Sequence, residues 1–321
     1  MKPKEILVFG ASGQIGRHLI RKLTKNNYKV VAVTRNIHQK GYILKTQANP
    51  GYLEIVELSY FNLEKIESLI EGCSICVNLI GILFEKKKNT FKNIHTDFPD
   101  LLSKLSAKKN IEKLIHLSSL GIEKSLDSKY AISKLEGENK IKNNFDRSAI
   151  LKPSLVYSVD DNFTTNFMTL LNRLPIMPLY YEGKTKFAPI HVTDLVEIII
   201  NVVKGKLNER TIECIGPEIL SFKEIILKLL KAIDKKRLLI PIPLSVAKMT
   251  AKFFELMPNP LITVDQINLL KYDNIPSGLY KTNFELNFNA KKIFDEELKK
   301  YSFNWRDGGQ YSRDKVSRTN R

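Results

Sequence analysis

Residues 5–16 read EILVFGASGQIG, an apolar run followed by three glycines spaced three residues apart. The apolar run predicts a buried strand over 6–10. After the last glycine, apolar residues recur every three or four positions, which predicts an amphipathic helix over 14–26. A strand and a helix joined by a glycine-rich turn typically begin a parallel sheet of the α/β class. This stretch therefore predicts the fold class of the chain.

The three glycines have separate expected roles. Gly10 permits the tight turn, Gly13 lets the backbone approach a pyrophosphate, and Gly16 lets the helix pack closely on the strand. The phosphates of a dinucleotide would lie at the helix N-terminus, where free N–H groups and the helix dipole favour anions. Without the flanking strand and helix, such glycines would indicate only a turn. The predicted phosphate loop consists of Gly10, Ser12, Gly13, Gln14, Ile15 and Gly16.

Short β-like runs alternate with longer amphipathic runs through the first half of the chain. Strands are predicted over 6–10, 29–34, 53–57, 75–80, 113–118 and 148–152, and helices over 14–26, 62–71, 91–109 and 130–144. This alternation is typical of a doubly wound parallel sheet, the Rossmann arrangement, with helices on both faces. We therefore predict an α/β Rossmann domain over residues 1–152.

After Pro153 the pattern becomes less regular. Helices are predicted near 193–204, 221–233, 244–256 and 263–271, with a strand near 210–214. These elements predict a smaller α/β lobe over 153–304, partly interleaved with the sheet and lying over the carboxyl ends of the strands, where such sheets bind ligands. The segment 305–321 loses apolar periodicity and is predicted to be a flexible tail.

Composition is that of an ordinary globular protein. Of 321 residues, 43% are hydrophobic and 26% charged, and 51 Lys and Arg against 34 Asp and Glu give a formal charge of +17. The lysines are scattered, which favours a general lysine bias over a dedicated partner, although attraction to an acidic membrane or protein face stays open. The chain lacks the aromatic-interleaved basic stripes of single-strand binders, so no nucleic-acid partner is predicted.

The sequence predicts a cytoplasmic protein. No stretch approaches ~18 uninterrupted apolar residues, and no signal-like segment precedes the first strand, so we expect the mature chain to begin at the fold. Three cysteines are too few for a secreted disulfide framework. Cys73 and Cys76 have C-x-x-C spacing, but they precede a strand and no second pair complements them. Neither a redox site nor a metal site is predicted.

The end of the second predicted strand favours NADP(H) over NAD(H). Residues 31–36 read VAVTRN, without the acid that would accept a hydrogen bond from the ribose of NAD(H). Arg35 lies 19 residues after Gly16, and a guanidinium can bind a 2′-phosphate with two hydrogen bonds. The alternative is that Arg35 is an ordinary surface residue after a strand.

The glycine spacing resembles that of the short-chain dehydrogenase/reductase superfamily, in its extended or atypical branch. Three further motifs agree with it: NLIG at 78–81, LSS at 117–119 and YAISK at 130–134. The resemblance implies that Tyr130 exchanges a proton with a substrate hydroxyl or carbonyl. It also implies that Ser119, or alternatively Ser118, hydrogen-bonds the same oxygen, and that Lys134 contacts the nicotinamide ribose.

The spacing of Tyr130 and Lys134 suits this chemistry. Four residues apart on a helix, the two side chains share one face. A free phenol has a pKa of about 10, so we expect the nearby ammonium to favour the phenolate. The predicted catalytic residues are Ser119, Tyr130 and Lys134. The predicted cofactor-binding residues are those of the phosphate loop together with Arg35, Leu79, Gly81, Tyr130, Lys134 and Pro153.

A narrower resemblance covers the later half. The blocks ILKPSLVYS at 150–158, LPIMPLYYEGKTKFAPIHVTDLVE at 174–197 and DQINLLKYDN at 265–274 resemble the NADPH-binding accessory subunits of respiratory complex I (NADH:ubiquinone oxidoreductase) and their alphaproteobacterial relatives. The resemblance implies tight NADPH binding, generally without turnover, and complex I subunits as partners. It further implies peripheral association with the cytoplasmic face of the inner membrane through those partners. The turn YYEG at 180–183 departs from the glycine-richer pattern of these subunits, and Leu58-Ser59 lacks the acid that many relatives place near the adenine.

Three functions stay open at this point. The chain is an accessory or assembly component of complex I, an active NADP(H)-dependent reductase, dehydratase or epimerase in quinone or lipid metabolism, or a nucleotide sensor. Ser119, Tyr130 and Lys134 favour turnover or descent from an enzyme, because a purely structural nucleotide site has little need of a proton donor. The later blocks favour the complex I role.

Overall fold

A seven-stranded parallel sheet forms the centre of the larger half of the molecule in a computed structural model, which describes residues 5–86, 88–257, 260 and 262–309. The strand order is β11-β6-β5-β4-β1-β2-β3. The strands are β1 (Glu5–Phe9), β2 (Lys29–Thr34), β3 (Leu53–Glu57), β4 (Ile75–Asn78), β5 (Lys113–Leu117), β6 (Ser148–Pro153) and β11 (Thr211–Cys214). The order reverses between β1 and β4, which places a ligand crevice at the carboxyl ends of these two strands.

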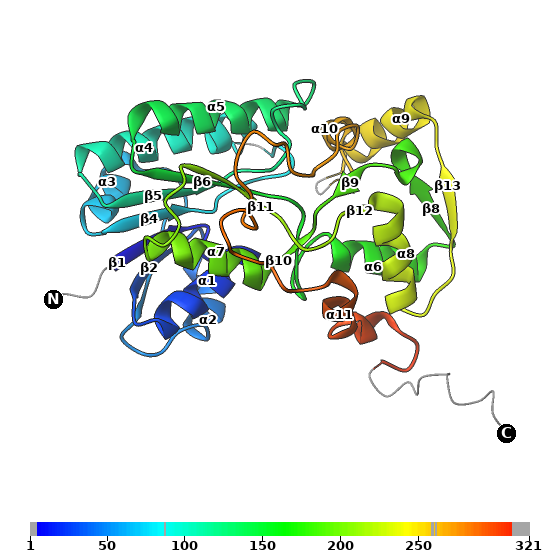
Figure 1. Ribbon diagram of the computed structural model, residues 1–321, viewed down its shortest axis with the longest axis horizontal. Coiled ribbons are helices and arrows are strands. Elements are labelled where there is room, and N and C mark those ends of the chain that lie inside the picture. Colours follow the sequence, from blue (N-terminus) through cyan, green and yellow to red (C-terminus); the bar gives the residue numbers. More distant parts are fainter. Residues whose placement is uncertain (1–4, 87, 258–259, 261, 310–321) are drawn as a thin grey trace.

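Helices cover both faces of this sheet (Figure 1). One face carries α1 (Gln14–Lys25), α2 (Ile37–Lys45) and α7 (Val192–Val203), and the other carries α3 (Leu63–Glu71), α4 (Phe98–Lys108) and α5 (Lys129–Asn144). Alternate strand residues explain the two layers: Ile6 and Val8 pack against the first set of helices, whereas Leu7 and Phe9 pack against the second. Because both faces are covered, the strands are almost continuously apolar.

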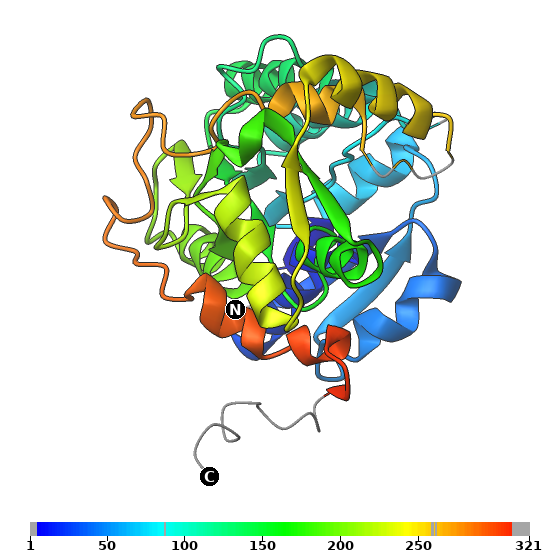
Figure 2. The ribbon, with the colours of Figure 1, turned by 90° about the vertical axis from the view of Figure 1, so that its right-hand side faces the viewer.

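The smaller lobe lies at the right of Figure 1 and faces the viewer in Figure 2. Its helices are α6 (Thr164–Arg173), α8 (Phe222–Ala232), α9 (Leu244–Phe254), α10 (Val264–Leu269) and α11 (Phe294–Lys299). Its short strand pairs are β7 (Val156–Tyr157) with β10 (Ile190–His191), β8 (Ile176–Leu179) with β13 (Leu238–Pro241), and β9 (Lys186–Phe187) with β12 (Leu220–Ser221). Two elements in the range 153–304 lie outside this lobe: β11 is a strand of the large sheet, and α7 packs against that sheet.

The predicted α/β Rossmann fold is confirmed, with local differences. The sequence pattern did not predict α2, which contains Gly41 in its middle. The helix predicted over 91–109 begins as a π-helix, Lys92–Asp97, before α4. The predicted tail begins with anchored residues: the Trp305 indole donates to Thr169 Oγ1 at 2.9 Å, and Arg306 Nε donates to the Ala232 carbonyl at 2.7 Å. The rest of that tail, residues 310–321, lies outside the described residues.

Candidate functional site

The phosphate loop has the close backbone packing that its glycines predict. Gly10 has a φ of +77°, a left-handed conformation that favours glycine. A Cβ on Gly16 would lie 2.5 Å from the carbonyl oxygens of Gly10 and Ala11, so no side chain fits there without a backbone shift. The Gly13 amide donates to the Gly10 carbonyl at 3.1 Å and closes the turn. The loop therefore leads directly into the N-terminus of α1.

The N-terminal turn of α1 suits an anion. Gly13 is the N-cap and provides no side-chain acceptor for the first N–H groups of α1. Arg17 lies in the same turn and pairs with Asp160, while its buried Nε has no hydrogen-bond partner among the described residues. Gln14 Nε2 donates to Ser158 Oγ at 2.8 Å. These residues fit the pyrophosphate of a dinucleotide, and Ser158 and Asp160 link the loop to the chain after β7.

Arg35 lies close to the phosphate loop at the end of β2. The preceding residue, Thr34, donates from Oγ1 to Ser12 Oγ at 3.3 Å, which brings the strand end next to the loop. The Arg35 side chain is exposed, and no hydrogen bond or ion pair joins it to a described residue. The nearby carboxylate of Glu57 accepts from the Ile37 amide at 3.2 Å. The guanidinium is therefore free to bind an anionic group.

The structure brings Ser119, Tyr130 and Lys134 together. Tyr130 and Lys134 lie one turn apart on α5, and Ser119, just after β5, lies close enough to the Tyr130 side chain to lower the pKa of its phenol. Lys134 Nζ lies 5.9 Å from the centre of the Tyr130 ring. The alternative serine, Ser118, is buried and donates instead to Glu138. Ser119 is consequently the serine that faces the phenol.

Burial dominates the acid–base properties of this pair. Burial raises the pKa of Tyr130; the nearby Ser119 side chain opposes this, and the charge of Asp265 adds a smaller increase. Burial also lowers the pKa of Lys134 to about 8, against the charge of Glu138. Lys134 Nζ donates to the Leu117 carbonyl at 3.0 Å. The expected preference for the phenolate is thus not present in the protein alone, because burial and the charge of Asp265 outweigh the opposing effect of Ser119.

Backbone segments complete the surroundings of Lys134. A Cβ on Gly81 would lie 3.5 Å from Lys134 Nζ, so this glycine approaches the ammonium closely. Leu79 lies two residues earlier, and its carbonyl carbon is 3.0 Å from the Cβ position of Gly10. The Pro153 carbonyl accepts from the Leu120 amide at 2.9 Å, next to Ser119. Leu79 and Gly81 therefore lie between the phosphate loop and the Tyr130–Lys134 pair, and Pro153 lies beside the serine.

Two residues of this site were not predicted from the sequence. The His95 ring, on the π-helix, packs edge-on against Tyr130 at 5.2 Å and hydrogen-bonds Ser133 Oγ at 3.0 Å. Burial lowers the pKa of His95, so its ring is neutral. The Asp265 carboxylate, from α10, accepts from Ser128 Oγ at 2.8 Å and from the amides of Lys129 and Tyr130 at 2.7 and 3.2 Å. Asp265 thereby caps α5 at the residue that carries the phenol.

The block 265–274, which resembles the accessory subunits, contacts the larger part of the molecule through several side chains. Besides the cap formed by Asp265, Asn268 Nδ2 donates to the Asp127 carbonyl at 3.2 Å. Asn274 donates to the Leu120 carbonyl at 2.5 Å and accepts from Ser154 at 2.6 Å. This block fastens the smaller lobe to the start of α5 and to the segment after β5.

The buried thiols lie outside this site. Burial raises the pKa of Cys73 to about 12 and that of Cys76 well above its ordinary value, which disfavours the reactive thiolate. In the part of the chain that the structure describes, no group of three His, Cys, Asp or Glu residues is arranged to hold a metal ion. The same part contains no helix long and apolar enough to cross a membrane.

Comparisons with known proteins identify the family to which this geometry belongs. The model of the NAD dependent epimerase/dehydratase family matches residues 6–213. The NADH-ubiquinone oxidoreductase 40 kDa subunit of Neurospora crassa mitochondria is 23% identical over 288 residues, covering 89% of this chain and 76% of that subunit. The mitochondrial NADH dehydrogenase [ubiquinone] 1 alpha subcomplex subunit 9 of Arabidopsis thaliana is 25% identical over 304 residues, covering 91% of this chain and 73% of that subunit.

Solved structures share the fold. The Bordetella bronchiseptica enzyme WbmG, solved in complex with NAD, superimposes with a TM-score of 0.69 over 95% of this chain and 94% of its own. Its sequence is 14% identical to this one, so the likeness supports the fold alone.

Proposed function

The chain belongs to the NAD dependent epimerase/dehydratase family, and we propose that it holds a nicotinamide dinucleotide and docks on respiratory complex I as an accessory or assembly component. The observation that carries this proposal is the alignment with complex I subunits over most of both chains. The 265–274 block adds a structural reason, because it fastens the lobe to the start of α5. A nucleotide bound in the crevice between the large sheet and the smaller lobe would stabilise the folded form of both.

NADP(H) is the proposed nucleotide, in preference to NAD(H). The support is the exposed guanidinium of Arg35 beside the phosphate loop, which pairs with no other described residue, and the absence of an acid in the sequence at the end of β2. A 2′-phosphate would give Arg35 a bidentate partner. The phosphate loop would hold the pyrophosphate, and Ser119, Tyr130 and Lys134 would face the nicotinamide end.

The proposed location is the cytoplasmic face of the inner membrane, through a protein partner. The test is to solubilise membranes in mild detergent and probe native gels for this chain, and to identify the nucleotide in the purified protein by mass spectrometry. We expect a salt-resistant fraction that migrates with complex I and carries NADP(H), and a salt-labile fraction held by surface charge. If every molecule is soluble at low salt and none migrates with the complex, the accessory role is wrong.

A second function is an active NADP(H)-dependent reductase, dehydratase or epimerase. The observation that favours it is the grouping of Ser119 and Lys134 around the Tyr130 side chain, with Lys134 one turn away on the same helix. Such a phenol can pass a proton to or from a substrate oxygen, with the nicotinamide supplying or accepting hydride. The test is hydride transfer to quinones or lipid carbonyls, with Tyr130→Phe as the control. Transfer that persists in that variant would show that Tyr130 is not the proton donor.

A further inference from the structure

Several charged side chains are buried directly behind the Tyr130–Lys134 pair. Glu138, one turn after Lys134 on α5, and Lys152, on β6, have fully buried side chains, and Lys134 is only 4% exposed. Burying a charge is costly unless an opposite charge and hydrogen bonds compensate for it. Apolar residues of similar size would often be at least as stable at such positions. Their presence here therefore invites an explanation beyond stability.

The contacts show which charges compensate each other. Lys152 Nζ donates to Glu138 Oε1 at 2.7 Å and to Glu123 Oε1 at 2.6 Å. Ser118 Oγ also donates to Glu138 Oε1. The Lys134 ammonium instead donates to a neutral acceptor, the carbonyl of Leu117. Among the described residues, no carboxylate is in hydrogen-bond contact with Lys134, and Glu138 is the acid one turn away on the same helix.

We infer that Glu138 and Lys152 are positioning residues: the Glu138 carboxylate keeps Lys134 in its charged form at the nucleotide site, and Lys152 limits how strongly it does so. The inference rests on the proposed role of Lys134 in nucleotide binding. It assigns the two residues opposite effects on one ammonium. A purely structural pair would instead give the same effect, a loss of stability, when either partner is removed.

Electrostatics agree with this assignment. The pKa of Lys134, about 8, is lowered first by burial, is raised by the charge of Glu138 and is lowered by the charge of Lys152. Two imidazoles face the same space, His95 from the π-helix and His116 from β5, and burial lowers the pKa of each, so both are neutral. Neither imidazole therefore adds a positive charge beside Lys134, and neither can supply the negative charge that would stabilise its ammonium.

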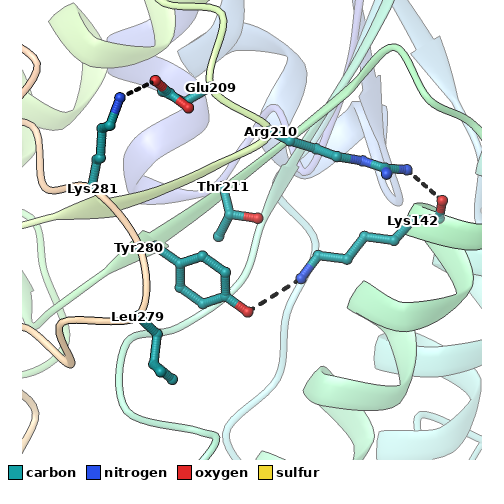
Figure 3. A pocket seen from close by; sticks show the side chains of 7 residues that line it. All are labelled: Lys142, Glu209, Arg210, Thr211, Leu279, Tyr280 and Lys281. Carbon is teal, nitrogen blue, oxygen red and sulfur yellow. Dashed lines mark hydrogen bonds and ion pairs between the residues drawn. The ribbon is translucent and has the colours of Figure 1, made fainter.

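The remaining groups face the outer side of the pair. Glu138 Oε2 has no hydrogen-bond partner among the described residues and lies 3.8 Å from Lys142 Nζ. The Lys142 ammonium points to the Tyr280 hydroxyl at 3.4 Å (Figure 3), and the Tyr280 ring centre is 5.6 Å from Lys152 Nζ. Lys142 and Tyr280 also line a cavity of about 380 Å³. The cavity therefore lies beside Lys142 and Tyr280, the outer neighbours of the buried charge pair.

The test measures NADPH and NADH affinity by calorimetry between pH 6 and 10. In the wild-type protein, affinity should fall as pH rises through the pKa of Lys134, because the ammonium is present only below it. Glu138→Gln should move this midpoint down by about one pH unit, and Lys152→Met should move it up by a similar amount. Glu138→Asp, which keeps the charge, should restore most of the wild-type midpoint. Glu67→Gln removes an acid of a surface ion pair and serves as the control without a shift.

A second measurement does not depend on nucleotide binding. The titration of Lys134, followed by NMR with ¹³Cε-labelled lysine and assigned with Lys134→Met, should show the same opposite shifts in folded protein. If both variants move the midpoint in one direction, or neither moves it, the inference is wrong even where NADPH binds. If NADPH and NADH fail to bind the wild-type protein while the NMR midpoints still shift oppositely, the proposed nucleotide function is wrong and the charge assignment stands.

Discussion

The phosphate loop and the Tyr130 site are built in different ways. The loop is contiguous, since Gly10, Gly13 and Gly16 determine its shape within seven residues. The Tyr130 site is assembled from separate segments, with Ser119 after β5, Lys134 on α5 and the cap from Asp265 on α10. A contiguous motif can therefore be interpreted from the sequence, whereas an assembled site depends on contacts between residues more than 100 positions apart.

The largest expected effect tests whether the contiguous loop is sufficient for nucleotide binding. Gly13 is exposed, and a Cβ there would meet only the Gly10 carbonyl, at 3.3 Å. Gly13→Val should therefore fold with little loss of stability. It should still lower NADPH affinity by about 100-fold or more, because the side chain fills the space of the pyrophosphate. Calorimetry measures the affinity and thermal unfolding measures the stability.

The matched control is Gly72→Val, at an exposed glycine with a φ of −79° after α3, far along the chain from the loop. It should bind NADPH as the wild type does. If the Gly13→Val variant binds NADPH as tightly as this control does, the phosphate loop does not hold the pyrophosphate.

The next effect concerns selectivity at the edge of the loop. Arg35→Asp removes an attractive partner of a 2′-phosphate and adds a repulsive one, so the ratio of NADPH to NADH affinity should fall by about tenfold or more. Arg21→Asp, an exposed charge reversal within α1, is the control for a change in net charge. Should the two variants keep the same ratio, Arg35 is an ordinary surface residue.

The sequence predicted most of the fold because its signals are local. Both faces of the sheet are buried, so the strands appear as apolar runs, and β2 and β3 have the predicted bounds. The π-helix was not predicted, because its contacts are not local in the sequence. Thr96 Oγ1, for example, donates to the Ser133 carbonyl on α5 at 3.0 Å. Ser119, Tyr130 and Lys134 followed from motifs. Asp265, in contrast, resembles an ordinary acid in the first turn of a helix, and only the fold brings it to α5.

A smaller effect tests the cap on the assembled site. Asp265→Asn removes the charge that interacts with the N-terminus of α5, so the free energy of unfolding should fall by about 1 kcal/mol. The same change should lower the pKa of Tyr130, because the Asp265 charge raises it. Urea unfolding and NMR of ¹³Cζ-labelled tyrosine measure the two effects. Asp127→Asn removes an exposed partner of Lys271 in the same region and should leave Tyr130 unchanged.

The smallest expected effect concerns Asp160, a residue distant in sequence whose side chain contacts the helix that follows the phosphate loop. Asp160 contacts Arg17 and, at 3.5 Å, His18, both on α1. Burial alone would raise its pKa, but the neighbouring His18 ring, the hydrogen bond from Ser158 and the charge of Arg17 lower it overall. A carboxyl with a lowered pKa contributes stability above its unfolded pKa, about 3.9, and loses it as pH falls through the folded value. Asp160→Asn should therefore cost about 0.5 kcal/mol at neutral pH, discounted for partial exposure.

This difference from the wild type should persist from neutral pH down to about pH 5 and shrink below about pH 4, as the wild-type carboxyl takes up its proton. Urea unfolding at a series of pH values measures it. Asp146→Asn is the control, because its carboxylate is 97% exposed and lies 3.4 Å from Arg210. A constant difference across this pH range would mean that shape, and not charge, links Asp160 to α1. The stability of the phosphate loop would then not depend on the Asp160 charge, whereas the Tyr130 site would still depend on the distant Asp265.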